Sequence, residues 1–223
     1  MPLPISVIVP VGPQEEYKQW LGECLESILV QDPAEIVIVD DQAHLDVRQL
    51  TRLSPTIVYR ANPWLCGCAM SWNFGQSYAT YPACFLMGSD DKLLPGCLES
   101  CLATYKANNY LDAWYNVTCE IQTGEIVDAF NNACMISKGL FKLLGGFAPS
   151  AFAAPDGWAI SIMMIHHPHR LIQVDKGKPL YWCRVHSAQD TPRVFGKYMD
   201  AAIMIRDIDT RTWVQPEWTN GVG

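Results

Sequence analysis

Residues 5–11 read Ile-Ser-Val-Ile-Val-Pro-Val, a run dominated by β-branched side chains. Such a run is typical of a buried strand. An amphipathic segment follows from Glu15 to Val30, with apolar residues at helical spacing, and Asp32-Pro33 ends it. A strand followed at once by a helix predicts the first half of a βαβ unit, which is the building block of a parallel sheet.

The same alternation continues through the first hundred residues. It predicts strands at 35–39, 56–60 and 83–87, and helices at 45–53, 67–78 and 95–108. Beyond Tyr110 the extended segments are shorter and mixed with helices. There we expect strands at 113–119, 125–130, 133–136, 170–174 and 180–185, and helices at 138–144, 156–166 and 194–206. The sequence therefore predicts an α/β fold, with a mostly parallel central sheet flanked by helices and a mixed C-terminal half.

Length and charge narrow the class of protein. A chain of 223 residues, 49% of them hydrophobic, can bury one sizeable core and is short for two independent domains. Sixteen Lys and Arg against 23 Asp and Glu give a net charge of −7. This charge disfavours extended binding to nucleic acid, whose phosphates are also negative. We expect a single domain.

The cysteines and the N-terminal residues bear on the compartment. Nine cysteines, an odd number spread through apolar segments, are typical of free thiols in a reducing compartment. The chain runs from Met1 straight into the first predicted strand, without the features of a secretory signal peptide. No stretch approaches the roughly 18 consecutive apolar residues that a membrane span needs. These features predict a soluble, cytoplasmic protein without a transmembrane segment.

Two acidic pairs follow predicted strands. Asp40-Asp41 ends the second strand and Asp90-Asp91 ends the fourth. In an open parallel sheet, ligands bind beyond the carboxyl ends of the strands, so both pairs face one crevice. Crowded carboxylates repel one another unless a cation or ligand hydroxyls stabilise their charged forms, and oxygen ligands favour Mg²⁺ or Mn²⁺. The competing interpretation is that these residues are ordinary turn formers.

Four motifs occur in order along the chain: Ile5-Ser-Val-Ile-Val-Pro-Val11, Glu23-Cys-Leu-Glu-Ser-Ile-Leu-Val-Gln31, Ile36-Val-Ile-Val-Asp-Asp41 and Gly88-Ser-Asp-Asp-Lys-Leu-Leu-Pro95. With them the sequence resembles the family 2 glycosyltransferases, which have the GT-A fold, over roughly residues 4–187. The resemblance implies an inverting transfer of sugar from a nucleoside-diphosphate sugar, with a UDP-sugar favoured, to an acceptor hydroxyl. It implies Mn²⁺ or Mg²⁺ as cofactor. It also implies a nucleotide-binding half at 1–110, an acceptor and catalytic half at 111–190, and a C-terminal helix and tail at 191–223.

By this resemblance, Pro10, Val11, Asp40 and Asp41 surround the base and ribose, with Asp41 as the base contact. Asn73 falls where the family often has an Asn close to the nucleotide. An amide on the helix surface is the alternative for Asn73.

The resemblance also suggests ligands for the metal and the diphosphate. Asp90 is expected at the ribose and Asp91 at the metal, although Gly88 and Ser89 stand where the family signature has an acid. His186 is a candidate second metal ligand, and Arg184 a candidate for a bidentate phosphate contact. For both, an ordinary polar role on the strand is the alternative.

The candidate base is Asp156, because the family has an acid at a helix start after a Gly-Gly-Phe turn, here residues 145–147. A helix start keeps a carboxylate ionised, but an ordinary N-cap is the competing role. Trp158, two residues further on, is the candidate aromatic residue at the acceptor.

Two other functions stay open. A sugar nucleotidyltransferase would need a cationic, Gly-rich loop after the first strand, and Val11-Gly-Pro-Gln14 carries no cation. A nucleotide-sugar-binding module without catalysis would keep the fold and lose the chemistry. The acceptor is open among a saccharide, a lipid carrier, a protein and a modified nucleobase, and a homo-oligomer is a further possibility.

Overall fold

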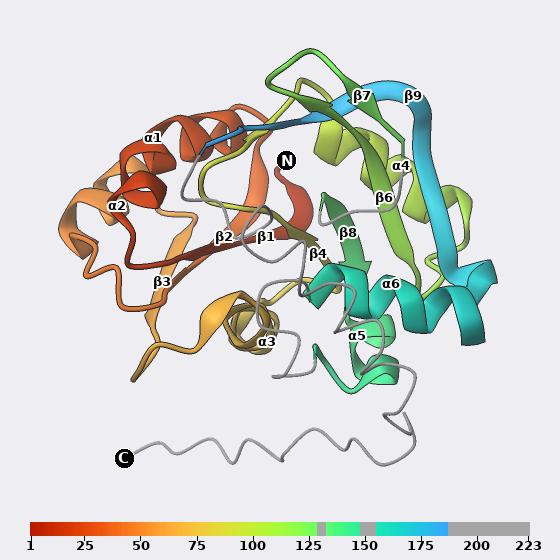
Figure 1. Ribbon diagram of the computed structural model, residues 1–223, viewed down its shortest axis with the longest axis horizontal. Coiled ribbons are helices and arrows are strands. Elements are labelled where there is room, and N and C mark those ends of the chain that lie inside the picture. Colours follow the sequence, from red (N-terminus) through yellow and green to blue (C-terminus); the bar gives the residue numbers. More distant parts are fainter. Residues whose placement is uncertain (129–132, 148–154, 187–223) are drawn as a thin grey trace.

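The protein, as a computed structural model, is described for residues 1–128, 133–147 and 155–186. This part of the chain forms a nine-stranded sheet in the order β3-β2-β1-β4-β8-β6-β9-β5, with β7 paired to β6 (Figure 1). The strands are β1 (Leu3–Val11), β2 (Pro33–Asp40), β3 (Ile57–Ala61), β4 (Ala83–Leu86), β5 (Lys92–Leu93), β6 (Trp114–Ile121), β7 (Ile126–Val127), β8 (Cys134–Ser137) and β9 (Leu171–Cys183). The helices are α1 (Glu15–Leu29), α2 (Val47–Leu53), α3 (Gly67–Tyr78), α4 (Cys97–Ala107), α5 (Lys138–Leu144), α6 (Pro155–His166) and the 3₁₀ turn η2 (Pro168–Arg170).

The first half of the sheet is parallel, as the βαβ pattern predicts. β1 lies between β2 and β4 and is parallel to both, and β3 extends the sheet beyond β2. The strands are buried on both faces because helices cover both. Along β1, Val7 and Val9 belong to one apolar cluster and Ile8 to the other.

Helices sort onto the two faces of the sheet (Figure 1). Side chains of α1, α2 and α4 join the cluster on one face, and those of α3, α5 and α6 join the cluster on the other. The predicted α/β fold with a mostly parallel central sheet flanked by helices is confirmed. The predicted helix at 194–206 and the tail lie outside the described residues.

The second half is mixed, as expected, but its strands differ in detail. β8 is antiparallel to both β4 and β6, whereas β9 is parallel to β6. The two extended segments predicted at 170–174 and 180–185 are one strand, β9. Its register with β6 breaks after Val174, where Asp175 and Gly177 have φ of 39° and 80°. The sequence did not predict β5, a two-residue strand that pairs with the end of β9.

Two further predictions concern thiols and membranes. All nine cysteines are free, and most of them are buried. No helix within the described residues is both long and apolar enough to cross a membrane.

Candidate active site

The direction in which successive strands are added to the sheet reverses at β1. The chain passes from β1 outward to β2 and β3, then returns to β4 on the other side of β1. Such a reversal is where open α/β sheets bind ligands. Pro10 and Val11 end β1, and the two acidic pairs follow the neighbouring strands β2 and β4. The fold therefore gathers these predicted residues at one edge of the sheet.

Asp40 is tied into the turn that follows β2. Its Oδ1 accepts from the backbone N–H of Ala43 at 2.6 Å and of His44 at 3.1 Å, and its Oδ2 accepts from Leu45 N–H at 2.8 Å. The Tyr59 hydroxyl donates to the same Oδ2 at 2.7 Å. Burial and this bond to Asp40 raise the pKa of Tyr59 to about 12. The Asp40 carboxylate is thus a structural centre of the turn.

Asp41 is surrounded in a similar way by donors at the start of α3. Its Oδ1 accepts from Cys66 N–H at 2.7 Å and from Asn62 Nδ2 at 2.8 Å, while its Oδ2 accepts from Gly67 N–H at 2.7 Å. A helix N-terminus favours a negative charge, because its first amides have no partner within the helix. Asp41 is therefore a buried carboxylate stabilised as an anion, and its own N–H donates to Val11 O at 2.9 Å.

Asp90 and Asp91 are also buried, but side chains supply much of their surroundings. The Tyr181 hydroxyl donates to Asp91 Oδ2 at 2.6 Å, and Arg184 N–H donates to Asp91 Oδ1 at 2.9 Å. His186 Nε2 lies 2.8 Å from Asp90 Oδ2. Burial, with the neighbouring Asp90 carboxylate second, raises the pKa of Asp91 well above its ordinary value. Burial and the neighbouring carboxylate thus disfavour the charged form of Asp91, and a cation bound beside the pair would favour it.

Gly88 lies directly beside both carboxylates of this pair. A Cβ atom on Gly88 would lie 2.6 Å from Asp90 Oδ1 and 3.1 Å from Asp91 Oδ2. Both carboxylates thus converge on the space beside Gly88, and they leave no room there for a side chain.

Three residues around this pair were missed by the sequence analysis. Tyr181 bridges it, since its hydroxyl donates to Asp91 and accepts from Gly88 N–H at 3.2 Å. Trp20 and Glu23, on the same face of α1, contact Arg184. The unusual density of aromatic residues near 17–20 and 181–182 was the available signal, but it does not reveal that these segments meet.

Arg184 and His186 lie beside the acidic pair, as predicted, with partners from the protein. Arg184 Nε donates to Asp90 O at 2.9 Å and its Nη2 donates to Glu23 Oε2 at 3.0 Å. The His186 ring lies 4.6 Å from the Trp20 ring between centroids. The phosphate contact of Arg184 and the metal contact of His186 stay predictions.

Asn73 connects α3 to the Gly-Gly-Phe turn. Its Nδ2 donates to Phe147 O and its Oδ1 accepts from Phe147 N–H, both at 2.8 Å. Gly146 has a φ of 81°, and a Cβ there would lie 3.0 Å from Asn73 Oδ1. The buried amide therefore holds the end of the turn at 145–147, which precedes α6.

Asp156 lies in the first turn of α6, as predicted. Its side chain and that of Trp158 lie outside the described residues. Their roles as base and acceptor contact remain predictions.

Within residues 1–128, 133–147 and 155–186, no group of three His, Cys, Asp or Glu side chains can hold a metal by itself. Mg²⁺ in nucleotide enzymes is usually bound by one or two carboxylates together with substrate phosphates and water. The buried pair beside Gly88 fits such a partial site.

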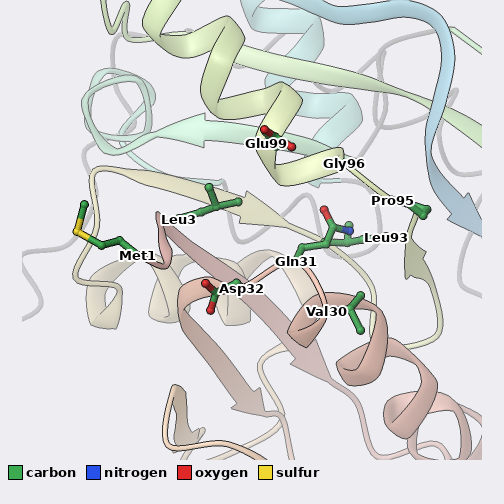
Figure 2. A pocket seen from close by; sticks show the side chains of 9 residues that line it. All are labelled: Met1, Leu3, Val30, Gln31, Asp32, Leu93, Pro95, Gly96 and Glu99. Carbon is green, nitrogen blue, oxygen red and sulfur yellow. The ribbon is translucent and has the colours of Figure 1, made fainter.

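A separate pocket of about 610 Å³ lies at the opposite, amino end of β1 (Figure 2). Gln31 lies in it with its amide already bonded to Leu94 O and Leu98 N–H. The pocket contains none of the predicted site residues. Its lining is Met1, Leu3, Val30, Gln31, Asp32, Leu93, Pro95, Gly96 and Glu99.

Comparisons with known proteins agree with this fold. The family model described as Glycosyl transferase family 2 matches residues 6–143. No curated protein sequence matches significantly. Among solved structures, TarS of S. aureus is similar with a TM-score of 0.69 and 18% identity, over 92% of this chain and 39% of that one. TarS 1–349 in complex with UDP-GlcNAc is similar with a TM-score of 0.71 and 16% identity, over 92% and 66%. Its complex with UDP has a TM-score of 0.70 and 17% identity, over 92% and 65%. The chain thus spans well under half the length of the full TarS chain.

Proposed function

Because the chain belongs to glycosyl transferase family 2, we propose that it transfers a sugar from a nucleoside-diphosphate sugar to an acceptor hydroxyl, with inversion. A UDP-sugar is the favoured donor, since the similar TarS structures include complexes with UDP and UDP-GlcNAc. The observation that carries the proposal is the buried Asp90-Asp91 pair beside Gly88, at the strand end where an α/β sheet binds nucleotides.

The nucleoside is assigned to the edge formed by Pro10, Val11 and Asp41. Asp41 offers a carboxylate that three local donors hold in place, which suits a fixed acceptor for a base N–H. Asp40 supports this edge through the turn at 43–45 rather than from a free carboxylate. Asn73 contributes to this edge only indirectly. It lies in α3, whose first N–H donates to Asp41, and its own amide donates to Phe147 O.

Asp91 is assigned to the metal and Asp90 to the ribose, with His186 orienting Asp90 from 2.8 Å. Mn²⁺ or Mg²⁺ bound here would supply positive charge to the leaving diphosphate. The chain's own contribution is to hold the two carboxylates close together in a buried site, where Tyr181 and Arg184 N–H fix the Asp91 oxygens. Asp156 is assigned to remove the proton of the acceptor hydroxyl as the attack develops.

Calorimetric titration of UDP and UDP-sugars, with and without Mn²⁺, tests the donor assignment. We expect binding that Mn²⁺ strengthens. A transfer assay on Asp156→Asn tests the base, and normal turnover by this variant would show that the base is elsewhere. If no nucleotide-sugar binds, the transferase proposal fails. If donor binds and no acceptor is glycosylated in a broad screen, the binding-module alternative is favoured.

A further inference from the structure

Arg184 stands directly beyond β9, where its main chain meets the acidic pair. Its backbone N–H donates to Asp91 Oδ1 at 2.9 Å. The neighbouring residues of β9 hold the same segment, because Tyr181 and Trp182 pair with Leu93 and Lys92 of β5. Backbone contacts alone therefore hold the end of β9 beside the acidic segment, without any contribution from the Arg184 side chain.

The guanidinium of Arg184 makes directional bonds of its own. Its Nε donates to Asp90 O, the carbonyl of the peptide between the two acids, at 2.9 Å. Its Nη2 donates to Glu23 Oε2 on α1 at 3.0 Å, and only 12% of the Arg184 side chain is exposed. The bond to Arg184 lowers the pKa of Glu23, as expected for a charged pair. One planar group thus links α1 to the Asp90–Asp91 peptide.

Two tryptophan rings lie close to the guanidinium. The guanidinium carbon lies 4.5 Å from the centroid of the Trp20 ring and 5.0 Å from that of Trp182. A guanidinium stacks on aromatic faces and bonds in its own plane at once, which an ammonium cannot do. The same Trp20 ring also contacts His186, which lies against Asp90.

We propose that Arg184 is a positioning residue that fixes the Asp90–Asp91 segment against α1, with Glu23 and Trp20 as its anchors. This inference rests on the proposed donor and metal site. It differs from the sequence-based expectation, in which Arg184 binds the donor diphosphate. Its positive charge faces the Glu23 carboxylate, and its Nε is committed to a main-chain carbonyl that orients the two acids.

Removal of the Glu23 charge distinguishes a positioning role of Arg184 from a phosphate-binding role, because the two roles predict opposite changes in UDP affinity. If Arg184 positions the acids, Glu23→Gln loosens the link and weakens Mn²⁺-dependent UDP binding, by about tenfold for one charge-assisted hydrogen bond. If Arg184 is a phosphate ligand, the same change frees its charge and strengthens UDP binding. Glu23 is exposed, so the core is left intact. Glu26→Gln, one turn further along the exposed side of α1, is the matched control and should bind as the parent protein does.

The experiment is calorimetric titration of UDP in Mn²⁺ on the full chain, with Mn²⁺ binding alone followed by electron paramagnetic resonance. A second variant, Arg184→Lys, keeps the positive charge but loses the planar guanidinium that bonds Asp90 O and Glu23 at once. We therefore expect its UDP and Mn²⁺ affinities to be as low as those of Arg184→Gln. Unchanged or tighter UDP binding by Glu23→Gln, or near-normal affinities in Arg184→Lys, would overturn this inference alone. Absence of UDP binding by the parent protein would overturn the proposed function and this inference with it.

Discussion

Asp40-Asp41 and Asp90-Asp91 are alike in sequence, since each is an acidic pair that follows a buried strand, yet the protein surrounds them differently. Backbone N–H groups of the next turn and of the α3 N-terminus supply most of the bonds to the first pair. The second pair is bordered largely by side chains, from Tyr181 and His186, and by the single N–H of Arg184. In the second pair, burial and the neighbouring Asp90 carboxylate raise the pKa of Asp91.

The difference follows from which groups surround each pair. The N–H groups of residues 43–45 donate to Asp40, and those of Cys66 and Gly67 at the start of α3 donate to Asp41. After Asp91 the chain enters β5, where Lys92 and Leu93 pair with β9 instead. The first pair is therefore stabilised as anions by the fold itself, whereas the second leaves charge for a ligand to compensate. Identical dipeptides thus receive different proposed roles, the first at the turn and the nucleoside edge and the second at the metal and ribose.

Asp91→Asn should show the largest functional difference between the two acidic pairs. We expect the variant to lose Mn²⁺ stimulation of transfer, a drop on the order of 1,000-fold, since metal stabilisation of the leaving group contributes several kcal/mol. Metal-free stability should not fall, because a buried carboxyl of raised pKa is removed. Transfer rates and thermal unfolding measure both. Asp41→Asn is the companion variant: it should weaken UDP binding equally with and without Mn²⁺, and loss of the Mn²⁺ effect there instead would reverse the assignment of the two pairs.

Asp40→Ala is expected to affect stability most. The change leaves three N–H groups and the Tyr59 hydroxyl without their acceptor, which should lower the free energy of unfolding by about 3 kcal/mol. Urea denaturation measures this loss. Asp46→Ala is the control, because Asp46 caps α2 with its side chain and should cost only about 1 kcal/mol. Equal losses in the two variants would show that Asp40 is no more than a cap.

Gly88→Ala tests the close approach of the second pair. The added Cβ would push Asp90 Oδ1 away from 2.6 Å, so we expect Mn²⁺-dependent UDP affinity to fall by about tenfold. Calorimetric titration is again the measurement. Gly22→Ala, in α1 with nothing near its Cβ position, should leave that affinity unchanged and favour the helix. Normal affinity in Gly88→Ala would mean that the pair tolerates separation.

The smallest expected effect concerns pH at the first pair. The pKa of Tyr59 is about 12 in the folded protein, above its ordinary value of about 10. The folded state therefore holds the hydroxyl proton more tightly, and the stability from this bond is present below about pH 10 and is lost as pH rises toward about 12. Tyr59→Phe should thus be less stable near neutral pH and lose less stability on alkaline titration. Urea unfolding at about pH 8 and about pH 11 compares the two. If both proteins lost the same stability between the two pH values, Tyr59 would not be a source of the alkaline loss.

The first half of the fold was predictable because its signals are local. Alternating β-branched strands and amphipathic helices up to residue 107 are specified by neighbouring residues, and so are the strand ends where the acidic pairs stand. The bridging roles of Tyr181, Glu23 and Trp20 were not predictable. Each meets the Asp90–Asp91 region or Arg184 across a long stretch of chain, and no periodicity records such a meeting.

The sequence by itself determined the βαβ order, the family and the positions of the two acidic pairs, since these depend on local patterns and ordered motifs. Only the tertiary structure decided what surrounds each carboxylate. It placed backbone N–H groups around Asp40 and Asp41, and it brought β9 and α1 against Asp90 and Asp91. The physical reason is that the charge state of a buried carboxyl depends on the donors and charges within a few ångströms, and the packing of distant segments sets these.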